Sequence, residues 1–130
     1  MTDLTLNHIT KEIIGAAIEV HKTLGPGLLE SVYQNCLFLE FQKRNLKFKA
    51  QAIVPIHYKG IAIKKDFVLD FLVEDEIVVE LKSVETVLPI HEAQLLTYLK
   101  LSEKPLGLLI NFNVAKLTQG ITRRVNNFKE

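Results

Sequence analysis

The sequence predicts an α/β domain in which helices cover both faces of a mixed sheet. Apolar residues recur at helical spacing near the N-terminus and again after residue 89, and short runs typical of strands lie between these stretches. The run 106–112 is apolar without alternation, as expected for a strand covered on both faces. In chain order, the predicted elements are helices 6–23 and 28–44, strands 48–58, 61–73 and 77–84, helix 89–101, and strands 106–112 and 120–125. Helices on both faces of the sheet would bury its apolar residues.

Glycine, proline and polar residues mark the boundaries of these elements. The segment 24–27, Leu-Gly-Pro-Gly, ends the first helix, and Asn45 is a plausible stop for the second. Pro55 predicts an edge strand or a bulge, because proline cannot donate to a strand ladder. The segments 59–60 and 74–76 are predicted to be turns that join three strands in a meander.

Length and composition limit what kind of protein this is. The chain has 130 residues, which fits one domain spanning 1–130, and 48% of them are hydrophobic, which permits a sizeable core. The single cysteine, Cys36, excludes an intramolecular disulfide. No apolar run approaches the roughly 20 residues that span a bilayer, and the N-terminus does not resemble a signal peptide. We therefore expect a soluble, cytoplasmic protein that does not associate with membranes.

The net charge of +1 excludes a wholly basic nucleic-acid coat. Any phosphate binding must therefore come from local patches. Two candidate patches are visible in the sequence, one formed by Lys43, Arg44, Lys47 and Lys49 and the other by Arg123, Arg124 and Lys129. Both patterns are also typical of ordinary solvated surfaces.

Two predicted strands carry charged residues where apolar residues are expected. Asp70 stands within the apolar run 67–73, and burying an unpaired carboxylate costs several kcal/mol. Glu80 and Lys82 stand in the next strand and point to the same face, because side chains alternate along a strand. The tight reversal at 74–76 lets Asp70 lie beside Glu80.

This arrangement points to a metal-dependent phosphodiester hydrolase. Two neighbouring carboxylates stay ionised near neutral pH only with a positive group between them, and oxygen ligands favour Mg²⁺ or Mn²⁺. The carbonyl of Leu81 is a candidate further ligand. The Lys82 ammonium could stabilise charge on a phosphoryl oxygen or, with a lowered pKa, help to deprotonate a water. The alternative is a buried salt-bridge cluster of Asp70, Glu80 and Lys82 without catalytic function.

Two helices carry further candidates. Glu30 and Tyr33 are three residues apart, and Gln94 and Tyr98 are four apart, so each pair lies on one helix face. Glu30 could bind the metal directly or through water, and Gln94 could hydrogen-bond a scissile phosphate or a water that binds the metal. Tyr98 could contact the backbone of a nucleic acid or stack on a base, and Tyr33 is grouped with it as a substrate-binding residue. The alternative is an exposed Glu and Gln, with two tyrosines packed at the rim.

These residues match a known pattern. Asp70, followed after nine residues by Glu80-Leu81-Lys82, resembles the signature of the PD-(D/E)XK nuclease superfamily, and Glu30 and Gln94-x-x-x-Tyr98 are similar to the extra motifs of its RecB-like branch. More closely, the chain resembles the bacterial GxxExxY proteins over residues 9–124. The matching stretches are GAAIEVHKTLGPGLLESVYQNCL, VLDFLVEDEIVVELKSV, HEAQLLTYLKL and GLLINFN.

The resemblance implies a restriction-endonuclease-like fold with an α-β-β-β-α-β core and an extra N-terminal helix. It also implies a Mg-dependent site at Asp70, Glu80 and Lys82, assisted by Glu30, Gln94 and Tyr98. Two positions depart from the pattern. Val68 stands where many relatives have a basic residue, and Leu69 replaces the proline of the superfamily name.

Two functional hypotheses follow. The first is a Mg-dependent nuclease that hydrolyses phosphodiester bonds of DNA or RNA. The second is a non-catalytic module that keeps the fold and binds nucleic acid or a protein partner, which the near-neutral charge and the minimal length favour. A homodimer would supply a missing grip surface, since small single-domain proteins often bind two-fold duplexes as dimers.

Overall fold

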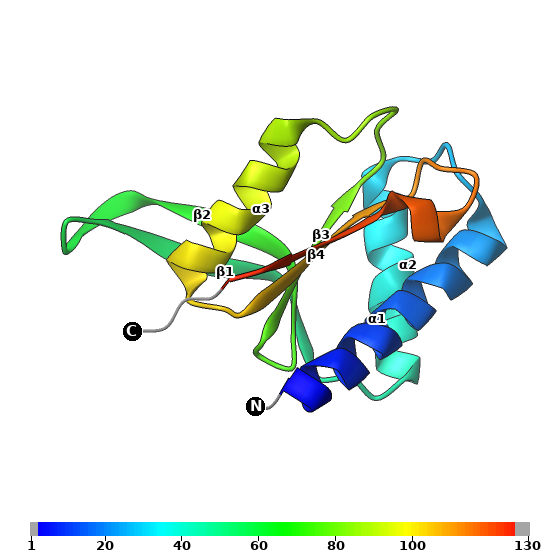
Figure 1. Cartoon of the computed structure of the whole chain (residues 1–130), viewed down its shortest axis with the longest axis horizontal. Helices are drawn as coiled ribbons and strands as arrows, with labels where there is room; N and C mark the ends of the chain where they lie inside the picture. The colour runs from blue at the N-terminus through cyan, green and yellow to red at the C-terminus, as the bar shows by residue number, and fades with distance from the viewer. Residues whose placement is uncertain (1–2, 127–130) are drawn as a thin grey trace.

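The chain forms helices on both sides of a five-stranded sheet. The computed structural model describes residues 3–126 (Figure 1). The elements run α1 (Asp3–Leu24), α2 (Glu30–Lys43), β1 (Phe48–Tyr58), β2 (Ile61–Val73), β3 (Ile77–Lys82), α3 (Pro89–Ser102), β4 (Leu106–Asn111), the short 3-10 helix η1 (Leu117–Gly120) and β5 (Ile121–Val125). This order confirms the predicted α/β class and the restriction-endonuclease-like arrangement with an N-terminal helix.

The sheet is mixed, with strand order β1-β2-β3-β4-β5. The first three strands form an antiparallel meander, β4 runs parallel to β3, and β5 runs antiparallel to β4. Strand β3 ends at Lys82, two residues before the predicted boundary. The reason is that the Asn111 side chain bonds both the N–H and the carbonyl of Val84, so this residue leaves the strand ladder.

Two apolar clusters lie on opposite faces of the sheet. Helices α1 and α2 cover the larger cluster, which includes Phe71 and Val79, and α3 covers the smaller one, which includes Val78 and Leu95 (Figure 1). The prediction of helices on both faces is therefore confirmed. In residues 3–126, no helix combines the length and the apolar composition needed to cross a bilayer.

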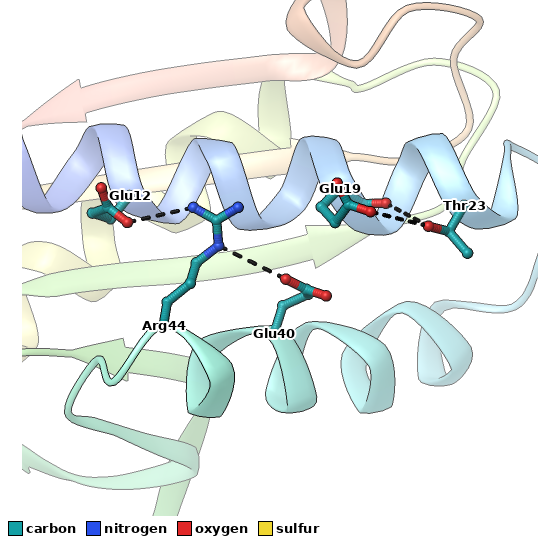
Figure 2. A network of polar contacts seen from close by, with 5 residues as sticks. All are labelled: Glu12, Glu19, Thr23, Glu40 and Arg44. Carbon is teal, nitrogen blue, oxygen red and sulfur yellow. Dashed lines mark hydrogen bonds and ion pairs between the residues drawn. The ribbon is translucent and has the colours of Figure 1, made fainter.

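Small residues and one arginine bring α1 and α2 together. Gly15 lies under the Arg44 guanidinium, where an added Cβ would come within 3.0 Å of Arg44 Nη1. Arg44 lies 3.4 Å from Glu12 on α1 and 3.7 Å from Glu40 on its own helix (Figure 2). Exposed ion pairs contribute only about 0–1 kcal/mol to the free energy of unfolding. These contacts therefore matter more for the alignment of the two helices than for stability.

The predicted turns and the edge strand are confirmed. Lys59 and Gly60, the two residues between the paired Tyr58 and Ile61, both have positive φ, as two-residue hairpin turns require. Glu74 and Asp75 of the three-residue turn 74–76 also have positive φ. Strand β1 lies at the edge of the sheet, and its register with β2 shifts between Pro55 and His57.

Candidate functional site

The backbone ladder between β2 and β3 stops where the charged residues begin. The last backbone pair is Phe71 with Val79, and one residue further Asp70 lies opposite Glu80. There the N–H of Asp70 donates to Glu80 Oε2 at 2.8 Å, and the N–H of Leu81 donates to Asp70 Oδ2 at 2.7 Å. Each carboxylate thus replaces a main-chain carbonyl as the acceptor across the two strands. The expected juxtaposition of Asp70 and Glu80 is present.

The hairpin of β1 and β2 is kinked beside Asp70. Ala50 and Ala52 are two residues apart, yet they contact opposite apolar clusters, and so do Phe71 and Leu69. Both strands therefore change face at this point. Gln51 adopts a left-handed backbone with φ 53°, and its side chain hydrogen-bonds the carboxylate of Asp70.

Strand β3 alternates as predicted. Val79 and Leu81 belong to the cluster under α1 and α2, whereas Val78 belongs to the cluster under α3. Glu80 and Lys82 are both half-buried and, by alternation with these residues, share the face of α3. Lys82 is close enough to lower the pKa of both Asp70 and Glu80, so the ammonium and the two carboxylates form one electrostatic unit.

Burial gives the two carboxylates high proton affinity. The pKa of Glu80 is raised to about 8, first by burial and then by the neighbouring charge of Asp70, against the opposing effects of the Asp70 N–H and Lys82. Burial also raises the pKa of Asp70, opposed by the Leu81 N–H, Lys82 and Gln51. The Lys82 ammonium therefore does not fully compensate the two charges, and a further cation would favour the doubly ionised pair.

Helix α2 brings Glu30 toward the site at its first residue. Partial desolvation and the charge of Asp70 raise the pKa of Glu30, while Lys82 lowers it. The loop before α2 is tied to the end of β3, because the hydroxyl of Ser83 donates to the carbonyl of Leu28 at 2.6 Å.

Tyr33 lies in the interior of the protein. Its side chain is fully buried and stacks on Phe112 with ring centroids 4.4 Å apart. Its hydroxyl donates to the carbonyl of Gly25 at 2.6 Å and accepts from the N–H of Leu28 at 3.2 Å. A buried ring with an engaged hydroxyl favours a structural role. We infer that Tyr33 positions the loop before Glu30, and the substrate contact expected from the sequence stays a prediction.

Helix α3 contributes Tyr98. The pKa of its hydroxyl is raised by desolvation and then by the charges of Glu80 and Asp70, so the phenol lies within reach of the site. Its ring stacks on Phe67 of β2, with centroids 4.5 Å apart. Gln94 is exposed one turn earlier and its side chain makes no hydrogen bond within residues 3–126, so its role stays a prediction.

Sequence reasoning missed two glutamines that contact Asp70. Gln34 donates from Nε2 to the carbonyl of Asp70 at 3.1 Å, and Gln51 bonds the carboxylate of the same residue. The spacing of Gln34, four residues after Glu30 on the same helix face, could have indicated the first. Gln51 could be found only from the pairing of β1 with β2.

The donor set suits a hard cation held by few protein ligands. Two adjacent carboxylates and a backbone carbonyl are oxygen donors, and Mg²⁺ commonly binds one or two carboxylates while keeping several waters. Within the described part of the chain, no group of three or more His, Cys, Asp or Glu side chains is placed to hold a metal ion. Glu30 therefore does not complete such a cluster here, and its expected role as a ligand, direct or through water, stays a prediction.

Comparison with known proteins places this geometry in a family. No curated protein and no solved structure matches the chain significantly. The model of one family, described as the PD-(D/E)XK nuclease superfamily, matches residues 7–125. The match includes both strands that carry the paired carboxylates and both helices that carry Glu30 and Tyr98. The chain therefore belongs to the PD-(D/E)XK nuclease superfamily.

Proposed function

We propose that the chain is a metal-dependent nuclease that hydrolyses phosphodiester bonds of DNA or RNA. The observation that carries this proposal is the pairing of Asp70 and Glu80 where the ladder between β2 and β3 stops, with Lys82 on the face of Glu80. Membership of a nuclease superfamily supports the same reaction class.

Asp70 and Glu80 would hold the metal, Mg²⁺ or Mn²⁺. The carbonyl of Leu81 and the carboxylate of Glu30 are the further ligands that we propose. When bound, the ion would polarise the phosphate and lower the pKa of a coordinated water. The backbone N–H groups of Asp70 and Leu81 keep the two carboxylates oriented before the ion arrives.

The remaining residues would act on the substrate or on the carboxylates. The Lys82 ammonium would stabilise negative charge on the phosphoryl oxygens or orient the attacking water. Gln94 and Tyr98 would position the nucleic acid. Gln34 and Gln51 act as positioning residues, because each hydrogen-bonds Asp70.

We also propose that the chain is a GxxExxY protein of the RecB-like branch, acting as a single domain in the bacterial cytoplasm. Its motif would consist of Gly27, Glu30 and Tyr33. Gly27 has a φ of 95°, which glycine adopts without strain, and Tyr33 bonds the loop that contains it. Two of the three motif residues would thus set the start of α2, where the third presents its carboxylate.

Cleavage assays test the nuclease directly. Purified protein is incubated with single-stranded and double-stranded substrates and Mg²⁺ or Mn²⁺, in parallel with Lys82→Ala. We expect the variant to lose roughly 100- to 1,000-fold in rate, as when one stabilising group for a developing oxyanion is removed. Lys100→Ala, which removes an exposed lysine of α3, is the matched control. Cleavage by Lys82→Ala at the rate of the parent would overturn the proposal.

A non-catalytic module that binds nucleic acid or a protein is the second candidate. The specific observation in its favour is the lack of a third acidic or histidine ligand beside Asp70 and Glu80 in residues 3–126. This candidate predicts nucleic-acid or partner binding without cleavage and without metal binding. The nuclease predicts that both cleavage and metal binding depend on Asp70.

A further inference from the structure

The far half of the β1–β2 hairpin extends beyond the helices that cover the sheet. We call residues 53–66 the arm, which appears as the green ribbon at the left of Figure 1. All residues from Ile61 to Asp66 are exposed, so neither face of β2 is covered there. Cover begins at Phe67, whose ring stacks on Tyr98 of α3. An isolated two-stranded ribbon is marginally stable in water, so folding alone does not explain this extension.

The arm carries positive charge that the protein does not neutralise. Lys59, Lys64 and Lys65 stand against the single acidic residue Asp66. Within residues 3–126, none of these lysines forms an ion pair. In the two patches that sequence reasoning selected, Arg44 is paired with Glu12 and Glu40, and Arg124 with Glu92, whereas the other described cations of these patches form no ion pair within residues 3–126, namely Lys43, Lys47, Lys49 and Arg123. Lys129 lies outside the described residues.

Other features of the arm argue against a second copy of the chain as its occupant. Pro55 lacks an N–H on the edge strand, and the register shifts beside it, so adding another strand there is disfavoured. Two copies of the arm would also bring six lysines together, which repel one another. A polyanion is the occupant whose charge complements this surface.

Strand β2 runs without interruption from the tip of the arm to Asp70 of the proposed site. Lys65 is five residues before Asp70, and Lys59 is eleven residues before it. At about 3.3 Å per residue, the distance to Asp70 is roughly 16 Å from Lys65 and at most about 36 Å from Lys59. A duplex rises about 3.4 Å per base pair, so on a duplex that runs along the strand these lysines would reach phosphates roughly five to ten base pairs from the reacting bond.

The aromatic content of the arm favours a duplex over a single strand. Proteins that bind single strands stack successive bases on several aromatic side chains. The arm offers one tyrosine, Tyr58, and one imidazole, His57, and the ammonium of Lys59 lies 5.4 Å from the centroid of the Tyr58 ring. A two-stranded ribbon fits the major groove of B-form DNA, whereas the major groove of A-form RNA is too narrow.

We propose that the arm binds the phosphates of duplex DNA through Lys59, Lys64 and Lys65 and so selects long duplexes for the site at Asp70. This rests on the proposed nuclease function for the reaction, but the binding can be measured without it. The arm would supply the grip that a net charge of +1 does not provide elsewhere.

Fluorescence anisotropy with labelled DNA duplexes in metal-free buffer tests the binding. We expect affinity to rise with duplex length up to about ten base pairs and then to level off. The triple variant K59Q/K64Q/K65Q should bind a 20-base-pair duplex at least about 10-fold more weakly, with a salt slope smaller by roughly two to three. The matched control K11Q/K22Q/K116Q removes the same charge from exposed lysines outside the arm and should bind like the parent.

Three outcomes would overturn the proposal. The first is equal binding by the arm variant and the control variant. The second is tighter binding of single-stranded DNA or duplex RNA than of duplex DNA of the same length. The third is a dimer in light scattering that dissociates in Ile61→Asp, because the arm would then be occupied by a second copy.

Hydrolysis assays separate this proposal from the nuclease proposal. With Mn²⁺, the arm variant should hydrolyse bis(p-nitrophenyl) phosphate like the parent, because this small diester cannot reach the arm, while cleavage of long duplexes falls at least about 10-fold. If the parent hydrolyses nothing yet binds duplexes through the arm, the nuclease proposal fails and the arm proposal stands. Equal loss on both substrates would contradict a role limited to the arm.

Discussion

Two adjacent stretches of strands β2 and β3 are held together by different kinds of hydrogen bond. At Phe71–Val73 the strands are joined by backbone hydrogen bonds and bury apolar side chains completely or nearly so. One residue further, Asp70 and Glu80 join the strands through their carboxylates instead. The first stretch stabilises the fold, whereas the second raises the pKa of Glu80 to about 8, a sign that its charge is poorly solvated. The polar stretch therefore costs folding free energy, which the proposed metal binding would explain.

Truncation of the apolar stretch should have the largest effect. Phe71 is fully buried and packs edge-on against Phe41 and Phe48. Phe71→Ala should lower the free energy of unfolding by about 3–5 kcal/mol, because it removes buried area and leaves a cavity. Urea denaturation measures the change. Val68→Ala, at a partly exposed position of the same strand, should cost less than about 1 kcal/mol, and equal costs would contradict the account.

The pH dependence of stability probes the polar stretch. The folded pKa of Glu80, about 8, lies above its ordinary value of 4.5, so the folded chain binds the proton more tightly than the unfolded chain. This contribution to the free energy of unfolding is complete below about pH 4.5 and is lost as the pH rises through about 8. The raised pKa values of Asp70 and Glu30 act in the same direction.

Replacing Glu80 with a residue that does not titrate should reduce the pH dependence of the free energy of unfolding. In metal-free buffer, Glu80→Gln should be more stable than the parent at pH 8–9 by on the order of a few kcal/mol and should lose less stability between about pH 5 and 9. Thermal or urea unfolding across this range gives the two profiles. Parallel profiles for the two proteins would show that Glu80 is not the destabilising group.

The smallest effect is expected from substitution of Tyr33, which we infer to position the loop before Glu30. Tyr33→Phe keeps the stack on Phe112 and loses the hydroxyl bonds to Gly25 and Leu28. We expect a loss of about 1 kcal/mol in unfolding free energy and a several-fold loss of cleavage through displacement of Glu30. Tyr58→Phe, whose ring is exposed, should leave the free energy of unfolding unchanged. Reduced cleavage with unchanged stability would instead favour a direct contact of Tyr33 with substrate.

Local chemistry made much of the fold predictable from sequence. Asn45 ends α2 with a φ of 57°, Pro89 begins α3, and the turn at 74–76 brings Asp70 opposite Glu80. Each of these results depends on residues that are close in the chain. Local patterns of this kind fix where elements begin and which strands meet in a hairpin.

Features that depend on distant packing were not predictable. Tyr33 is buried because Phe112, far along the chain, stacks on it. Gln51 reaches Asp70 only through the register of β1 with β2 and a left-handed backbone at Gln51 itself. The sequence also predicted a strand over 61–66, but it did not predict that both faces of this strand would be uncovered and its lysines exposed.

Calorimetric titration of Mn²⁺ into the protein tests most directly whether Asp70 and Glu80 share a cation. A shared cation predicts saturable binding of about one ion per chain, with proton release near neutral pH because binding requires the ionised carboxylates. Asp70→Asn should abolish binding, while Asp75→Asn, which alters an exposed carboxylate in the β2–β3 turn, should preserve it. No binding by the parent at millimolar Mn²⁺, or equal binding by Asp70→Asn, would contradict it.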